Sequence, residues 1–412
     1  MYPIPTFLVP AAAAITLLCA APVLAAPDQD VEPGALRVKP VIEVRARYET
    51  VEQGALQADA ATVRVRAGGE AAWGRFTLLA EGEATVAIAK EYNAFPFAIA
   101  GESQRRPQYA TVADPENAEL NRLQLRYAAG KNAITLGRQR INFDDQRWVG
   151  SVGWRQNEQT FDAVRAEGML GPVIADFAYA IAQRSIFGED ADARAAYGGD
   201  IVMAGLSTKA GPIEAKLFAY LFDYDEAFFA ANSSQTYGGI VRGVFPVGAA
   251  SKLSLRASYA RQADLGSNPF DYAADYWAVE GGSSVAGFAL TAGWERLGSD
   301  SGRSLQTPAA TLHKFNGWAD LFLTTPPAGL DDAYVSVGKT FKKLGPLSAV
   351  ILGVTFHQFD SAAGDIEYGT EWDASAGFKA AGIGWLLKFA DYRAAAFGAG
   401  TRKLWLQAEW AL

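Results

Sequence analysis

Cysteine, histidine and long apolar runs are scarce in this 412-residue chain, and each scarcity excludes a class of protein. The single cysteine, Cys19, lies close to the N-terminus, so the sequence after it offers no disulfide framework and no cysteine metal site. Only two histidines occur, and no HxxxH motif or calcium-loop spacing is present. We therefore expect neither a metal nor a cofactor.

Positive charge is also in deficit, because the formal net charge is −8 and the pI is about 5.1. This balance argues against nucleic acid as a partner. The arginines are unevenly spread, however, with 15 of 24 between residues 37 and 165. Hydrophobic residues make up 50% of the chain while the mean hydropathy is only +0.01. Apolar and polar residues must therefore be interleaved along the sequence.

The long apolar run lies within residues 1–25 and ends in Val23-Leu24-Ala25, a pattern typical of a signal peptide. We expect cleavage after Ala25; the alternative is a single transmembrane anchor. Leu18 stands where a lipobox needs a small residue, which argues against lipidation of Cys19. Residues 26–37 are then expected to be a short periplasmic segment of an exported protein.

After residue 26 no stretch of 18 apolar residues occurs, which excludes membrane-spanning helices. Period-two alternation, as in residues 120–128, predicts strands with an apolar and a polar face. Short glycine-bearing turns join such strands into pairs. The turns lie at 72–74, 130–132, 171–172, 211–212, 246–249, 283–287, 344–346 and 381–382.

Longer polar stretches, for example 93–119, 142–159 and 297–330, lie between the strand pairs. Short turns that alternate with long loops are typical of outer-membrane barrels. We therefore predict that residues 38–412 form an all-β, transmembrane, antiparallel up-and-down β-barrel. It should have eighteen strands, short periplasmic turns and long extracellular loops. A soluble propeller or solenoid would show a shared repeat motif, and we find none.

The last strand, within residues 402–412, alternates apolar with polar side chains and carries Trp410. It resembles the signal that the outer-membrane assembly machinery reads, although Leu412 replaces the usual terminal phenylalanine.

Several expected strands carry charge on their polar face, and a charge that faces lipid near the bilayer centre costs about 2–4 kcal/mol. Eight such charges would exceed a typical stability of about 5–15 kcal/mol, so they should face inward. Two interpretations remain open: a cationic conducting lumen that concentrates anions, or a plugged interior in which arginines pair with carboxylates. The expected pore-lining residues are Arg45, Arg47, Arg64, Arg66, Arg122, Arg126, Lys252, Arg256, Glu43, Glu81 and Glu83.

Strict alternation from Ile134 and Leu136 would aim Arg138 and Arg140 at lipid. Either a bulge at Gly137 returns both arginines to the lumen, or both lie at the extracellular end of the strand and meet lipopolysaccharide phosphates.

The segment LGRQRINFDDQRWVGSVGWRQNEQTFDAVR, residues 136–165, resembles the signature of the alginate-export family of outer-membrane proteins. HKFNGWADLFLTTPPAGLDDAYVSVG (313–338) and AYLFDYDE (219–226) add to the resemblance. It implies an eighteen-stranded barrel with an arginine-rich, constricted pore, through which the exporter itself passes an anionic uronic-acid polymer.

The motif residues would form a loop folded over or into the pore, together with the two arginines above. They are Asp144, Asp145, Arg147, Trp148, Trp154, Arg155 and Asn157. The alternative is that Asp144, Asp145, Arg147 and Arg155 pair merely to stiffen a long loop.

We expect a passive outer-membrane channel for anionic solutes or saccharides, in a Gram-negative bacterium. An uptake porin for small organic anions or oligosaccharides is the alternative. A barrel enzyme is disfavoured because His313 and His357 have no evident serine partner. A TonB-dependent receptor is disfavoured as well, because it would need a plug domain of over a hundred residues before the barrel, and the expected strands start near residue 38. The expected partners are outer-membrane lipids, lipopolysaccharide, the assembly machinery and an anionic saccharide or small anion, and the protein is expected to be a monomer.

Overall fold

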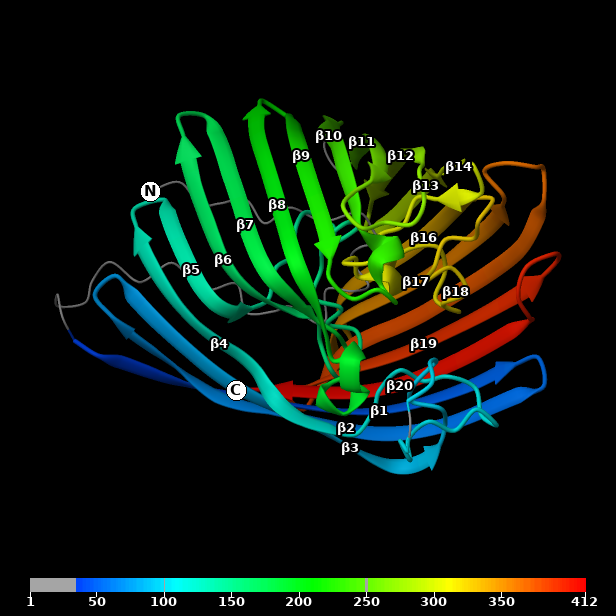
Figure 1. Ribbon diagram of the computed structural model, residues 1–412, viewed down its shortest axis with the longest axis horizontal. Helices are drawn as coiled ribbons and strands as arrows, with labels where there is room; N and C mark the ends of the chain where they lie inside the picture. Colours follow the sequence, from blue (N-terminus) through cyan, green and yellow to red (C-terminus); the bar gives the residue numbers. More distant parts are fainter. Residues whose placement is uncertain (1–34, 100, 249–250) are drawn as a thin grey trace.

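The computed structural model describes residues 35–99, 101–248 and 251–412. Eighteen strands form one antiparallel sheet, which closes on itself because β1 (Arg37–Gln53) pairs with β20 (Thr401–Ala411). In Figure 1 the blue first strand lies beside the red last strand. The predicted eighteen-stranded barrel is confirmed. The expected signal peptide, residues 1–25, and most of the expected periplasmic segment, 26–37, lie outside the described residues.

The first nine barrel strands after β1 are β2 (Leu56–Trp73), β3 (Phe76–Glu91), β4 (Asn117–Ala129), β5 (Asn132–Gln139), β6 (Thr160–Leu170), β7 (Val173–Arg184), β8 (Ala196–Ala210), β9 (Ile213–Tyr224) and β10 (Ser234–Val247). The remaining strands before β20 are β11 (Ser251–Asp264), β12 (Ala273–Val285), β13 (Phe288–Leu297), β16 (Leu330–Leu344), β17 (Leu347–Asp360), β18 (Glu367–Ala380) and β19 (Ile383–Ala394). The loops add the small hairpin β14 (Ser299–Asp300) and β15 (Arg303–Ser304) and the 3-10 turns η2 (Glu189–Arg194), η3 (Ala230–Asn232) and η4 (Leu312–Lys314).

All eight predicted short turns join consecutive strands at one end of the barrel. Gly171 and Gly211, each followed by proline, have φ of 63° and 60° and so occupy the left-handed region that favours glycine. At the other end a two-residue turn, 54–55, joins β1 to β2, and longer connections join the other strands. In outer-membrane barrels the short-turn end is periplasmic.

The two faces of the sheet differ as the alternation predicts. Outward side chains are apolar and exposed, for example Leu217 at 68% and Leu136 at 61%. Polar and charged side chains face inward and are buried, for example Arg64 at 0% and Glu83 at 3%, and on β8 and β9 apolar side chains such as Ile201 and Phe218 face inward as well. An apolar exterior around a polar interior is the arrangement that a lipid bilayer requires of a barrel.

Among the residues described, no helix has both the length and the hydropathy to cross a membrane.

The buried apolar core of this protein lies inside the barrel. Two of the long loops, residues 140–159 and 298–329, fold inward and pack against the wall, and we call them the first and second inward loops. Phe143 and Trp148 of the first inward loop and Leu305 and Phe322 of the second belong to one buried cluster with inward side chains of the strands. The loops therefore narrow the lumen.

Candidate channel lumen

The structure places all eleven predicted pore-lining side chains at inward positions of their strands: Arg45, Arg47 and Glu43 on β1, Arg64 and Arg66 on β2, Glu81 and Glu83 on β3, Arg122 and Arg126 on β4, and Lys252 and Arg256 on β11. Their surroundings differ along the barrel. Arg45 and Arg64 are 2% and 0% exposed, because the first inward loop covers them. Lys252, near the short-turn end, is exposed.

The buried arginines form ion pairs rather than a bare cationic wall. Arg45 Nη2 lies 3.1 Å from Glu409 Oε1, and Arg47 Nη1 lies 3.3 Å from Asp114 Oδ2. The complete cluster joins the seven arginines Arg45, Arg47, Arg64, Arg66, Arg122, Arg140 and Arg155 to the eight carboxylates Glu43, Glu49, Glu81, Glu83, Asp114, Glu158, Asp320 and Glu409. Lys403 of β20, which pairs with Asp320 at 2.9 Å, adds an eighth positive charge. The charges therefore balance, and the plugged interpretation describes these arginines.

The paired arginines also hold the first inward loop by its backbone. Arg45 Nη1 donates to the carbonyl of Gly153 at 2.9 Å, and Arg64 Nη1 donates to the carbonyl of Gln156 at 3.4 Å. Arg47 donates to the intervening carbonyl of Trp154. Backbone carbonyls inside a barrel need such partners once they leave water. The arginines of β1 and β2 thus act as donors that seat the loop.

Charged residues of the 136–165 motif fasten the same loop to other parts of the wall. The contacts are Asp144 to Lys216 Nζ at 2.6 Å, Asp145 to Arg256 Nη2 at 2.8 Å, Arg147 Nε to Glu295 at 2.7 Å and Arg155 Nη1 to Glu49 at 3.3 Å. No ion pair joins these four motif residues to one another in the part of the chain that the structure describes. Their ion pairs reach the wall and other loops, and the one bond among them within the described residues is the backbone N–H of Arg147, which donates to Asp145 at 3.1 Å.

The remaining motif residues are buried within the lumen. Trp148 and Trp154 are each 5% exposed and Asn157 is 0% exposed. Trp148 packs edge-on against Tyr276 of β12, with ring centroids 5.0 Å apart, and against Phe218 of β9 at 5.5 Å. The loop thus spans from the aromatic side of the wall to its arginine side.

Arg138 and Arg140 take different sides. Gly137 has a φ of 110°, but pairing on both sides of it runs without a register shift, so the predicted face-switching bulge is wrong. Arg138 stands opposite the outward Leu123, and its Nε lies 2.8 Å from Asp162 Oδ1 near the loop end of the barrel. Its contact with lipopolysaccharide remains a prediction.

Arg140 faces the lumen because β5 ends at Gln139 and alternation no longer applies. It pairs with Glu158 of the first inward loop and lies 3.7 Å from Glu81. Burial alone would raise the pKa of Glu158, but Arg140 and the neighbouring Arg66 and Arg122 lower it to about 2. Glu158 is therefore ionised at any physiological pH.

The second inward loop rests on an acidic part of the wall that sequence reasoning missed. The backbone N–H of Trp318 donates to Asp373 at 3.2 Å, and that of Ala319 donates to Glu371 at 2.7 Å. Gly317, with a φ of 82°, permits this approach, since a Cβ there would lie 2.4 Å from the Glu371 carboxylate. In the sequence, the alternating carboxylates Glu371 and Asp373 are the signal that could have indicated this acidic part of the wall.

Exposed lysines surround the short-turn mouth. Lys39 on β1, Lys209 on β8, Lys252 on β11 and Lys379 on β18 stand at inward positions within a few residues of an end of the strand. Lys39, Lys252 and Lys379 form no ion pair within residues 35–99, 101–248 and 251–412. Only Lys252 was predicted to line the pore. Lys209 and Lys379 could have been found from the sequence, because each lies two residues before a predicted turn.

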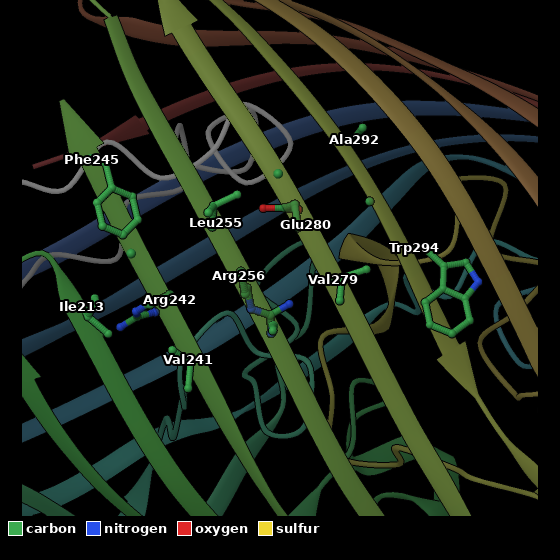
Figure 2. Close-up of a pocket in the computed structure, with 14 residues that line it drawn as sticks. Ile213, Val241, Arg242, Phe245, Leu255, Arg256, Val279, Glu280, Ala292 and Trp294 are labelled. Atoms are coloured by element: carbon green, nitrogen blue, oxygen red, sulfur yellow. The ribbon is translucent and has the colours of Figure 1, made fainter. Parts of the chain in front are cut away.

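A hollow of about 650 Å³ lies on the outer surface of β10 to β13 (Figure 2). Val241, Leu255 and Val279 line it from outward positions of adjacent strands, and Gly243 deepens it. The hollow therefore belongs to the lipid-facing surface and not to the lumen.

The closed barrel, its apolar exterior and its inward loops define an outer-membrane porin fold. Three solved structures from Pseudomonas aeruginosa are similar to the chain. OpdK has a TM-score of 0.70 at 13% identity and OccK9 (OpdG) 0.70 at 12%, each over 91% of this chain and 98% of that chain. OccD3 (OpdP) has a TM-score of 0.68 at 12% identity over 92% of both chains. The protein is located in the outer membrane of a Gram-negative bacterium.

The alginate export family model matches residues 42–176. This confirms the predicted resemblance over the segment that holds the 136–165 motif, whereas the other two motifs lie outside the match. No curated protein matches the chain.

Proposed function

We propose that the barrel is a passive channel for anionic solutes, in which solutes diffuse through the lumen without any covalent step. The observation that carries the proposal is the position of uncompensated positive charge. The seven arginines of the cluster are paired with carboxylates, but Lys39, Lys252 and Lys379 are exposed at the short-turn mouth without ion-pair partners among the described residues. Glu70 stands opposite Lys39 in the strand register and Glu214 opposite Lys209, so the mouth carries both signs of charge. Exposed lysines that form no ion pair raise the local concentration of anions beside them.

The inward loops narrow the lumen, so the channel should admit smaller solutes than an empty eighteen-stranded barrel would. The partial match to the alginate export family supports an anionic saccharide as the solute. An uptake porin for small organic anions or oligosaccharides is the second candidate, and one fold neighbour, OpdK, is described with vanillate. The direction of transport follows the solute gradient in either case.

A barrel enzyme has less support from the side-chain contacts. Such an enzyme needs a nucleophile held against a base. His313 contacts Asp320 and Lys388, and His357 contacts Asp332 at 2.8 Å. Neither contact set supplies a hydroxyl nucleophile.

Liposome swelling with sugars of equal size and different charge tests the proposed function. We expect glucuronate to enter faster than glucose, and glucose faster than glucosamine, because the mouth lysines attract anions. The variant Lys39→Gln/Lys252→Gln/Lys379→Gln should lose most of this order while it keeps entry of glucose.

Lys90→Gln is the matched control, because Lys90 lies at the loop end of β3, away from the short-turn mouth, and pairs with Glu116 at 2.6 Å. It should swell like the unmodified protein. Equal entry of the three sugars, or faster entry of glucosamine, would show that the lumen does not select anions.

A further inference from the structure

One lysine of the wall contacts both inward loops at once. Lys388 of β19 is 4% exposed, and its Nζ lies among three indole rings. The distances to the ring centroids are 4.1 Å for Trp154, 3.7 Å for Trp318 and 5.4 Å for Trp405. Trp154 belongs to the first inward loop, Trp318 to the second and Trp405 to β20. Cation–π contacts are strongest where the cation is shielded from water, so the cage of three indole rings joins both loops to the wall.

His313 of the second inward loop completes the arrangement. Its Nε2 lies 2.7 Å from Lys388 Nζ and its Nδ1 lies 2.7 Å from Asp320 Oδ1. Its ring also stacks on Trp154, with centroids 4.4 Å apart and planes 5° from parallel. When Lys388 is an ammonium group it can only donate, so Nε2 accepts and Nδ1 carries the proton that Asp320 accepts. With a charged Lys388 the geometry therefore fits a neutral imidazole.

We propose that Lys388, His313 and Asp320 form a proton-operated latch that holds both inward loops against the wall. Protonation of His313 at Nε2 removes the acceptor of Lys388 and places two cations at hydrogen-bond distance. Both loops are then released together, because Trp154 and Trp318 share the same cage. The latch is independent of the solute and goes beyond the proposed channel function.

The direction of the pH effect follows from burial. Burial lowers the pKa of His313 well below 6.5; Asp320 opposes this shift, while Lys388 and Arg155 add to it. The other charged groups that face the latch from neighbouring elements are Arg47 and Glu49 of β1, Asp373 of β18 and Lys403 of β20. A depressed pKa in the latched state means that the latch is fully stable above about pH 6.5 and weakens as the pH falls below it.

Labelling of a buried cysteine measures the release. Ser151 in the first inward loop is 6% exposed, so Ser151→Cys in a Cys19→Ser background should react slowly with a methanethiosulfonate at pH 7.5. Ser301→Cys places a thiol in the exposed turn of the β14–β15 hairpin. Its labelling rate changes with pH only through ionisation of the thiol, so dividing by this rate gives a corrected rate for the buried position. We expect the corrected rate to rise by about tenfold per pH unit below pH 6.5, since the protonated fraction rises by that factor.

Three further variants, each made in the Ser151→Cys background, decide the assignment. His313→Gln keeps an acceptor for Lys388 but cannot titrate, and it should abolish the pH response. His357→Gln, the matched histidine control, should retain it. Lys388→Met should expose the introduced thiol already at pH 7.5. Heat-modifiable migration in gels shows that each barrel is folded.

The latch is contradicted if the corrected rate of the unmodified latch is the same at pH 7.5 and pH 5. It is contradicted equally by an unchanged pH response in His313→Gln, or by an introduced thiol that stays protected in Lys388→Met.

Discussion

Replacing Arg155 with methionine should lower the free energy of unfolding by about 3–5 kcal/mol, the usual cost of breaking a buried ion pair by removing one partner. Arg155 lies 3.3 Å from Glu49 and 3.0 Å from Asp320. Burial alone would lower the pKa of Arg155, but Glu49, Asp114 and Asp320 raise it, so its charge is integral to the cluster. Glu49 has no other ion pair among the described residues and would be left as a buried, unpaired charge. Denaturant titration of protein folded in phosphocholine vesicles measures the change.

The double variant Arg155→Met/Glu49→Gln should recover part of this loss, because the orphaned carboxylate is removed. Arg261→Met is the matched control: Arg261 is exposed and pairs with Asp275 at 3.0 Å on the outer surface, where an ion pair is worth about 0–1 kcal/mol. A loss below about 1 kcal/mol in Arg155→Met would mean that the first inward loop is not anchored in the way described.

The second large effect concerns the lipid-facing surface. Leu217 is 68% exposed and lies near the middle of β9 (Ile213–Tyr224) on its outward face. Leu217→Arg should cost about 2–4 kcal/mol in the same titration, the penalty for an arginine near the bilayer midplane of a barrel. The reason is that a guanidinium would have to leave water for hydrocarbon.

Lys216→Arg tests the neighbouring inward position, where a charge is already accommodated by Asp144. It should change the stability by less than about 1 kcal/mol. If the two variants cost the same, the inward and outward faces of β9 have been assigned wrongly.

The barrel itself was predictable, because alternation and glycine-bearing turns are local properties of the sequence. The eight turns and eighteen strands follow from them. The inward direction of Arg45 and Arg64 follows as well, since a charge on the lipid face is costly. Their partners were not predictable, because Glu409 lies 364 residues from Arg45 along the chain and meets it only when the barrel closes.

The inward loops show a second limit of sequence reasoning. Alternation fails where a strand ends: it aimed both Arg138 and Arg140 outward, which holds for Arg138 but not for Arg140, because Arg140 follows the last residue of β5. The position of the second inward loop depends on Gly317 and on carboxylates of β18, which only the tertiary structure brings together.

The reversal potential of single channels in a tenfold potassium chloride gradient tests the central claim most directly, which is that uncompensated lysines make the lumen prefer anions. The account predicts a potential of the sign set by chloride, which shrinks in the Lys39→Gln/Lys252→Gln/Lys379→Gln variant. A potential of the sign set by potassium, or none at all, would contradict it.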